Sequence, residues 1–450
     1  MAEDVRLYIE QNNIRKIKLG VFDMDGVLRG KYISLDKFYS AVENGLGFCE
    51  VIFGWDSNDQ LYEGPEATVT GYPDTPAKID LDTARIVPWE PDTAIFLVDM
   101  YDQAGQPLDV SPRQLLQKVI REAEALDFRP YMSSEYEFFI FRETPESVRE
   151  KNYRNMTPLT PGMFGYSVVR ASSVADLIHS IIDQMNAYDV PIEGIHTETG
   201  PGVYETAIAY DTALRAADKS ALFKTGMKEI SSRHDLIVTF MAKWRADLPG
   251  CSGHVHQSLW DSDGKRNLFY DAQGDHHMSD LMRHYLAGQL TLMRELTVLM
   301  APTVNSYKRL VPGAWAPTTV SWGIENRTAA LRAIPAGAKS SRIECRLPGA
   351  DVNPYLAMAA MLAAGLYGIK HKMEPPDPWN QNAYTAPENT FSALPGTLEE
   401  ATALLKESVV AREMFGSVFV DHYVTTREWE IKQFRQAVTD WELARYFEVI

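Results

Sequence analysis

The chain has 450 residues, of which 44 are basic and 61 acidic, so its formal net charge is −17. Hydrophobic residues make up 45% and charged residues 23% of the sequence, which excludes an intrinsically disordered chain and predicts one large domain or two to three ordinary ones. The negative charge repels phosphate backbones and anionic lipid headgroups. We therefore expect neither nucleic acid nor a membrane surface as the main partner.

The N-terminal segment is acidic and polar and lacks the apolar stretch of a signal peptide, so we expect a cytoplasmic protein. The longest nearly apolar run, residues 356–369, is shorter than the about 20 residues that span a bilayer and predicts a buried core helix. The cysteines, Cys49, Cys251 and Cys345, are far apart and lack CxxC spacing. This pattern predicts reduced thiols instead of a disulfide framework or a cysteine zinc site.

In chain order, short apolar segments separated by Gly, Pro and Asp predict a strand-rich domain near the N-terminus. We expect this domain to cover residues 1–105 and a larger α+β domain to cover residues 106–450. Ser111 as N-cap and Pro112 at the first helical position open a helix. Apolar periodicity predicts further helices near residues 174–188, 212–234, 278–300, 354–369 and 425–445. The Pro-rich residues 375–387 predict an exposed connection.

Chemically active side chains occur at alternate positions in four predicted strands. In MSSEYEFFIF, Glu135 and Glu137 share one face of the strand. In EGIHTETGPGVYETAIA, the TGPG turn predicts a hairpin that brings Glu198 and Glu205 together. Glu193 and His196 lie just before the turn. Two further strands, SGHVHQSLW and KSSRIECRL, place on one face His254, His256 and Ser258, and Arg342, Glu344 and Arg346.

Each of these strands also has an ordinary structural explanation: a solvated strand end, a charged hairpin mouth, a polar strand face or a salt-bridge ladder. Their occurrence in one domain favours a shared site. Five acids and a histidine form an oxygen-rich coordination set that suits Mg²⁺ or Mn²⁺ better than zinc, and the surplus arginines suit phosphate and carboxylate.

Two other segments leave alternatives open. Arg309, Arg327 and Arg332 frame a loop rich in Pro and Gly, which either closes over a substrate or is an ordinary surface loop. VFDMDGVL, with Asp23 and Asp25, copies the start of haloacid-dehalogenase-like phosphatases. The repeated βαβ units of that fold are missing from the following residues, and Asp-Gly after a strand is a common hairpin turn, so we favour the turn.

Together and in this order, SGHVHQSL, NSYKRLVPG, NRTAALR and RIECRLPGADVNPYLA resemble the glutamine synthetase superfamily in its bacterial class I form. The resemblance runs from the N-terminal strands to the last helices. It implies an α+β fold with an N-terminal β-grasp domain and a catalytic domain whose curved antiparallel strands form a funnel. It also implies two stacked rings, usually a homo-dodecamer, with active sites between neighbouring subunits of one ring.

The implied reaction is an ATP-dependent ligation in which the γ-carboxylate of glutamate forms γ-glutamyl phosphate, which an amine then attacks. The resemblance assigns two to three Mg²⁺ or Mn²⁺ ions to a first site at Glu137, Glu198 and Glu205 and a second at Glu135, His254 and Glu344. It assigns the glutamate site to Arg309, Arg346 and Gly250. It assigns the transferring phosphoryl group to Arg327. It assigns the ATP site to Glu193, His256, Ser258, Arg332, Lys339 and Arg342.

The chain departs from the family pattern at the amine site. Trp315 stands where glutamine synthetases carry a glutamate that helps to bind and deprotonate ammonium. An indole cannot accept that proton, but it offers an apolar or cation–π face to a larger amine. Asp56 is the best match to the ammonium-binding aspartate, with Asp59 second, and Pro249 lies where an asparagine is usual. We therefore expect a γ-glutamylamide synthetase that takes an organic amine. A glutamine synthetase using ammonium and a catalytically inactive structural relative are the alternatives.

Overall fold

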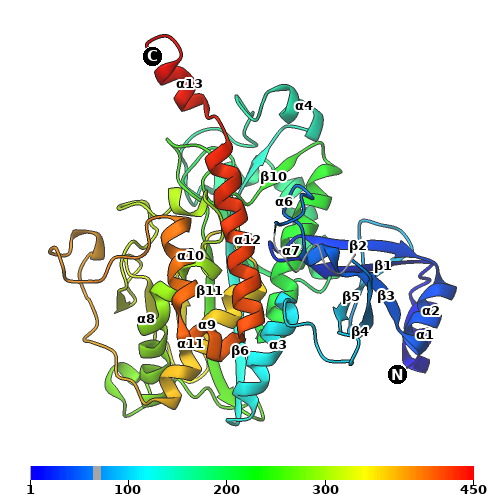
Figure 1. Cartoon of the computed structure of the whole chain (residues 1–450), viewed down its shortest axis with the longest axis horizontal. Helices are drawn as coiled ribbons and strands as arrows, with labels where there is room; N and C mark the ends of the chain where they lie inside the picture. The colour runs from blue at the N-terminus through cyan, green and yellow to red at the C-terminus, as the bar shows by residue number, and fades with distance from the viewer. Residues whose placement is uncertain (1, 64–71) are drawn as a thin grey trace.

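The strand-rich N-terminal region forms the smaller of two sheets. The computed structural model describes residues 2–63 and 72–450. The smaller sheet has the order β2-β1-β5-β4-β3, in which β1 and β5 are parallel and the other neighbours antiparallel. Its strands are β1 Lys16–Phe22, β2 Leu28–Ile33, β3 Leu46–Cys49, β4 Asp74–Ile86 and β5 Thr93–Met100. Helices α1 (Ala2–Gln11) and α2 (Leu35–Asn44) lie beside it, at one side of the larger body (Figure 1).

The phosphatase-like motif forms the turn between β1 and β2, as the hairpin interpretation predicted. One oxygen of Asp23 accepts hydrogen bonds from the backbone N–H groups of Asp25 and Val27, and the other accepts one from Arg29 Nε at 2.8 Å. Asp25 pairs with Arg427 of helix α12 (Ser417–Gln436) at 2.7 Å. Both aspartates therefore have a structural role: Asp23 stabilises the turn, and Asp25 joins it to the larger body.

The second sheet has nine strands in the order β12-β13-β14-β11-β6-β8-β7, with β9 and β10 also paired to β6. All neighbours are antiparallel except β12 and β13, which are parallel. The strands are β6 Phe128–Phe141, β7 Ile192–Thr197, β8 Val203–Ile208, β9 Asp211–Thr212, β10 Ile237–Thr239, β11 Gly253–Asp261, β12 Trp322–Ile324, β13 Leu331–Ile334 and β14 Arg342–Cys345.

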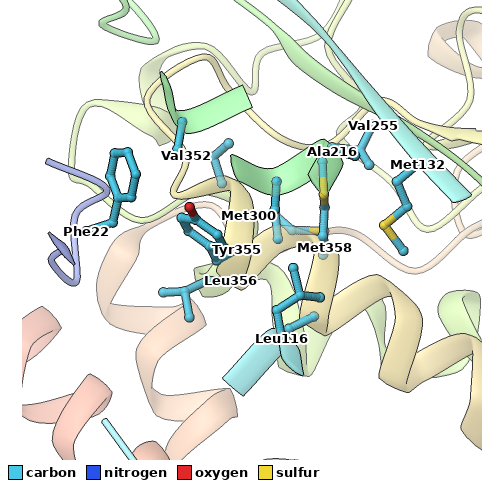
Figure 2. Packing of buried hydrophobic residues seen from close by; sticks show 14 of the residues in the cluster. Phe22, Leu116, Met132, Ala216, Val255, Met300, Val352, Tyr355, Leu356 and Met358 are labelled. Atoms are coloured by element: carbon cyan, nitrogen blue, oxygen red, sulfur yellow. The ribbon is translucent and has the colours of Figure 1, made fainter. Parts of the chain in front are cut away.

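The two faces of this sheet have different roles because side chains alternate along each strand. Met132 of β6 and Val255 of β11 pack into the hydrophobic core, where Figure 2 shows them near Leu116, Tyr355 and Met358 of the covering helices. The alternate residues of β6 are only partly buried, as expected of strands that carry a site on their second face.

Most predicted helices are present at the expected places. They are α3 Pro112–Glu124, α6 Ala175–Ala187, α7 Ala213–Ser232, α8 Asp280–Met300 and α9 Pro354–Lys370. The remaining helices are α4 Pro145–Glu150, α5 Val168–Ser172, α10 Leu398–Glu407, α11 Val409–Phe415, α12 Ser417–Gln436 and α13 Asp440–Tyr446. The α9 segment is a buried core helix, and the three cysteines are free, as predicted. Within the described ranges, no helix has the length and apolar character to cross a membrane.

The predicted helix at residues 425–445 was wrong in its bounds. The chain forms α12 and α13 instead, and α13 stands away from the body (Figure 1). The break has a local cause: Thr439 is an N-cap whose side chain accepts from the N–H of Glu442, while the Glu442 carboxylate accepts from the N–H of Thr439. This capping box starts a new helix, although the apolar periodicity of the sequence continues without a break.

A buried charge network joins the small sheet to helices α3, α7 and α9 of the larger body. Arg113 of α3 donates to Asp99 of β5 at 2.9 Å and to Asp80 of β4 at 2.7 Å. It also forms a two-pronged pair with Asp218 of α7 at 2.9 and 3.0 Å. The hydroxyl of Tyr355 donates to the same Asp218 at 2.6 Å. The domain boundary at residue 105 stays a prediction.

Candidate active site

The first cluster of ligand-type side chains spans three neighbouring strands. Glu135 of β6 and His254 of β11 are paired across the sheet, and Glu344 comes from β14. His254 Nδ1 lies 3.4 Å from Glu344 Oε1 and 3.7 Å from Glu135 Oε2. One ligand atom from each residue lies within 4.8 Å of the others. The structure thus brings together the three residues assigned to the second metal site.

The second cluster lies on the β7–β8 hairpin and contains His196, Glu198 and Glu205. His196 Nε2 lies 3.2 Å from Glu198 Oε1 and 3.8 Å from Glu205 Oε2. The three ligand atoms lie within 4.8 Å of one another. Glu137, assigned to the same metal site, is the register partner of Glu205, but its Oε2 accepts from the Ser252 N–H at 2.6 Å. Two of the three assigned residues therefore share a cluster with His196, and Glu137 lies beside it.

Burial and mutual repulsion raise the pKa of two of these carboxyls. Burial, followed by the charges of Glu137, Glu135 and Glu198, raises the pKa of Glu205 to about 9. Burial also raises the pKa of Glu137. Burial acts on Glu198 in the same direction, but hydrogen bonds from His196 and the Thr199 N–H and the charges of His196 and His254 together outweigh it and lower the pKa. Buried carboxylates that repel one another are stabilised in the charged form by a cation, so these residues fit a divalent ion.

In the first cluster the pKa values favour charged carboxylates and a neutral imidazole. Burial lowers the pKa of His254 to about 4, and the Arg346 charge adds to this effect. Burial opposes ionisation of Glu135 and Glu344, but His254 and other neighbours outweigh it and lower both pKa values, that of Glu344 to about 2. The His254 Nε2 atom is buried and has no hydrogen-bond partner among the residues that the structure describes. A neutral imidazole between two carboxylates is a donor set that fits Mg²⁺ or Mn²⁺.

The arginines assigned to the substrates are bonded within the protein. Arg332 Nη1 donates to Glu344 at 3.0 Å, and Arg346 pairs with the same carboxylate. Arg309 is buried and donates to Leu347 O and Ser252 Oγ, both at 2.9 Å. These contacts place all three guanidinium groups around the two clusters and fix their orientation.

Gly250 lies against the side chain of Arg309. A Cβ atom at this position would come within 2.6 Å of the Ala242 carbonyl oxygen and 2.8 Å of Arg309 Cγ. Residue 250 therefore has room only for glycine while Arg309 keeps its place.

A cavity of about 270 Å³ lies beside the first cluster, between β6, β11 and the segment that precedes β14. Its lining contains five of the six residues assigned to ATP: Glu193, His256, Ser258, Lys339 and Arg342. Glu135 also lines it, and Arg342 Nε lies 3.1 Å from His256 Nδ1. Arg332, the sixth residue, lies at Glu344 instead.

Four further predicted residues lie outside both clusters. Trp315 has a positive φ of 57° and its side chain is 64% exposed on the loop before β12. Arg327 is exposed on the loop after β12. Asp56 accepts from Trp429 Nε1 at 2.9 Å, and Asp59 pairs with Arg29 at 2.6 Å. Both aspartates therefore belong to a loop of the N-terminal region in this chain.

Two residues at the site were missed as functional candidates in the sequence. The rings of Tyr166 and His196 stack with centroids 4.2 Å apart, beside the carboxylates of the second cluster. Tyr166 has a positive φ of 54°, and its N–H donates to the carbonyl of Thr197 at 2.6 Å. Such strain in a residue other than glycine is concentrated at functional sites. Tyr166 lies in an irregular loop without periodicity, so no sequence signal marked it.

Comparisons with known proteins test the resemblance. A family model described as the glutamine synthetase catalytic domain matches residues 109–446. The chain belongs to this family. It is 47% identical to type-1 glutamine synthetase 2 of Dictyostelium discoideum, covering 100% of this chain and 87% of that protein. It is 41% identical to a glutamate–isopropylamine ligase of a Pseudomonas species, covering 99% and 98% of the two chains.

Solved structures extend this result to the whole fold. A GmaS structure in complex with ADP aligns with a TM-score of 0.86 and 28% identity, covering 99% of each chain. The predicted family and α+β fold class are therefore confirmed.

Proposed function

We propose that this member of the glutamine synthetase family is a γ-glutamylamide synthetase, which joins the γ-carboxylate of glutamate to an organic amine with consumption of ATP. The observation that carries the proposal is the pair of carboxylate–imidazole clusters, the first of which lies beside the cavity, together with Trp315 in place of the ammonium-binding glutamate. The isopropylamine ligase relative and the GmaS complex with ADP support the same assignment.

The reaction has two balanced steps. A γ-carboxylate oxygen attacks the terminal phosphorus of ATP, and ADP leaves. The amine nitrogen then attacks the acyl carbon, phosphate leaves, and the nitrogen loses a proton. The two anions that meet in the first step repel each other, so the site must supply positive charge.

The arginines of this chain supply part of that positive charge. The carboxylate–imidazole clusters supply the rest by binding divalent cations. We assign Arg309 and Arg346 to the glutamate and Arg327 to the transferring phosphoryl group. Divalent ions, when bound, reduce the charge repulsion between carboxylate and triphosphate. The residues that would hold these ions are Glu135, His254 and Glu344 at one position, and Glu137, Glu198 and Glu205, with His196 beside them, at the other.

The acceptor pocket and the assembly belong to the same proposal. Trp315 offers the amine an apolar wall, and Asp56 of a neighbouring subunit completes the pocket in a ring of subunits, stacked as a cytoplasmic dodecamer. Because Asp56 lies in the N-terminal region, outside both clusters of its own chain, a site between subunits explains how it could take part.

A panel of amines tests this function. ATP- and glutamate-dependent phosphate release should be faster with at least one organic amine than with ammonium at equal concentrations of the free base. A clear preference for ammonium would favour the alternative of an ordinary glutamine synthetase, which the Dictyostelium relative represents. The absence of ATP turnover with every amine and with ammonium would favour the inactive relative.

A further inference from the structure

The segment of residues 376–384 is tied to strand β12 and to the loop that follows it. Trp322 Nε1 of β12 donates to Pro376 O at 2.9 Å, and the Trp379 N–H donates to Trp322 O at 3.0 Å. Asn326 Nδ2, on the loop, donates to Trp379 O at 2.7 Å. These bonds fix the position of a segment that has little regular structure of its own.

Two further hydrogen bonds bring the end of this segment close to Arg346. The Ala383 N–H donates to Thr328 Oγ1 at 2.9 Å, and the Arg346 N–H donates to Ala330 O at 2.9 Å. The two acceptors belong to residues that are only two positions apart in the chain. The side chain of Tyr384, next to Ala383, therefore lies near Arg346.

The hydroxyl of Tyr384 faces the guanidinium groups that we assign to glutamate. The charges that act on it are those of Arg346 and Arg309, and both oppose the burial that raises the pKa of Tyr384. Burial outweighs them, so the hydroxyl stays protonated and can donate a hydrogen bond to an anion.

Two buried donors at this place have no partner. Among the residues that the structure describes, neither the Tyr384 hydroxyl nor Arg346 Nε makes a hydrogen bond. Buried polar atoms are normally bonded, so these two atoms call for an explanation. Because each can donate, an acceptor that lies between them would satisfy both. A carboxylate has two acceptor oxygens and carries the charge that suits the arginines.

We propose that the Tyr384 hydroxyl is a substrate-binding group that donates a hydrogen bond to a carboxylate of glutamate beside Arg346. This inference rests on the proposed function, since that function places glutamate at Arg309 and Arg346. The hydroxyl is in position before the substrate binds, because the segment that carries it is fixed by its bonds to β12 and the following loop. A substrate without that carboxylate leaves the buried donors unpaired, which makes Tyr384 a determinant of specificity.

Calorimetric titration of the full chain with L-glutamate, in the presence of ADP and Mg²⁺, tests the contact. Tyr384→Phe removes one oxygen atom and keeps the ring, so the fold should survive. The Kd for glutamate should rise about 10- to 100-fold, the loss expected for one hydrogen bond to a charged group. The matched control is Tyr307→Phe, which removes another buried hydroxyl that lacks a partner among the described residues. That hydroxyl faces Tyr423 and Asp351 instead, so the Kd should stay at the wild-type value.

Two analogues of glutamate identify the carboxylate. Glutamine has an amide in place of the γ-carboxylate, and isoglutamine has an amide in place of the α-carboxylate. The loss of affinity caused by Tyr384→Phe should shrink for the analogue that lacks the contacted carboxylate. A loss of equal size for glutamate and both analogues would overturn the contact, as would unchanged glutamate affinity in Tyr384→Phe.

In turnover, the KM for glutamate should rise in Tyr384→Phe, while the KM for ATP and the melting temperature stay near the wild-type values. A rise of both KM values together with a lower melting temperature would indicate a structural role and contradict the proposal. Glutamate binding needs no amine, so the two proposals fail separately. A wild type that ligates no amine but binds glutamate through Tyr384 refutes only the ligase. A working ligase whose glutamate affinity is the same in Tyr384→Phe refutes only the contact.

Discussion

Glu205 is the carboxyl whose charge is most unfavourable in the folded chain without a cation. Its pKa of about 9 compares with an ordinary value of 4.5, because the group is buried and faces Glu137, Glu135 and Glu198. The folded protein therefore keeps a proton that the unfolded chain releases. Stability from this group is complete below pH 4.5 and is lost as the pH rises toward 9.

Glu205→Gln removes this pH dependence. In metal-free protein, the free energy of unfolding of the variant minus that of the wild type should increase between pH 5 and pH 9, by up to about 1.4 kcal/mol per pH unit. Urea unfolding at several pH values measures this difference, in which other titrating groups cancel. Saturating Mn²⁺ should stabilise the wild type more than the variant. A difference that stays constant with pH would contradict the assigned burial and repulsion.

We propose that Trp315 controls a different property, the choice of amine. Trp315→Glu restores a group that can bind and deprotonate ammonium, so the ratio of kcat/KM for ammonium to that for the best organic amine should rise about tenfold or more, equivalent to about 1.4 kcal/mol. Val311→Glu adds the same charge to the same loop and should leave the ratio unchanged. Equal ratios in the wild type and Trp315→Glu would exclude Trp315 as the selector.

At the residue scale, the sequence predicted those site residues whose position follows from the alternation of side chains along a strand. Glu135 and His254 occupy alternating strand positions, and the sheet pairs them directly. His196 was noticed but not assigned, because its place between Glu198 and Glu205 depends on how the hairpin closes. Tyr166 depends on a loop held by Thr197, a contact that no local pattern encodes.

At the element scale, the C-terminal helices show the limit of periodicity. The apolar pattern continues through residues 425–445, but the capping box at Thr439 separates α12 from α13. Local hydrogen bonding thus set the helix boundary, although the hydrophobic pattern gave no sign of a break. The helices α7, α8 and α9 were predictable because each is long, with buried residues distributed along its length.

Thr439→Ala should loosen α13 without affecting the rest of the chain. Loss of an N-cap costs about 1 kcal/mol, which for a seven-residue helix that stands away from the body is a local effect. Hydrogen exchange measured by mass spectrometry should show faster exchange in α13, with α12 and the melting temperature unchanged. Val438→Ala, beside the cap, is the control. Exchange in α13 that matches the wild type would show that the cap is dispensable.

At the scale of the whole molecule, Arg113 connects elements far apart in the sequence. It faces Asp80 and Asp99 of the small sheet and Asp218 of α7, and it is nearly fully buried. Desolvation lowers the pKa of this arginine, but Asp218 and Asp99 outweigh it and raise the pKa well above the ordinary value. The guanidinium therefore stays charged and pairs with the carboxylates of Asp80, Asp99 and Asp218.

Arg113→Met keeps the length of the side chain and removes the charge. The buried carboxylates of Asp99 and Asp218 then lack their charged partner, so the free energy of unfolding should fall by about 3–5 kcal/mol. Denaturant unfolding measures the loss. Arg121→Met, on an exposed position of the same helix, should change stability by less than about 0.5 kcal/mol. Equal stabilities of the two variants would mean that the network contributes little.

The long strand β6 has a consequence for how such an enzyme can diversify. It presents Glu135 and Glu137 on one face and sends Met132 and Tyr136 into the core on the other. Inserting or deleting a single residue within the strand would exchange these sets, placing acids in the apolar interior and core side chains in the solvent. Changes of chain length are thus confined to the connecting segments, which include the loop of Trp315, the residue we propose as the amine selector, while the strands keep a fixed length.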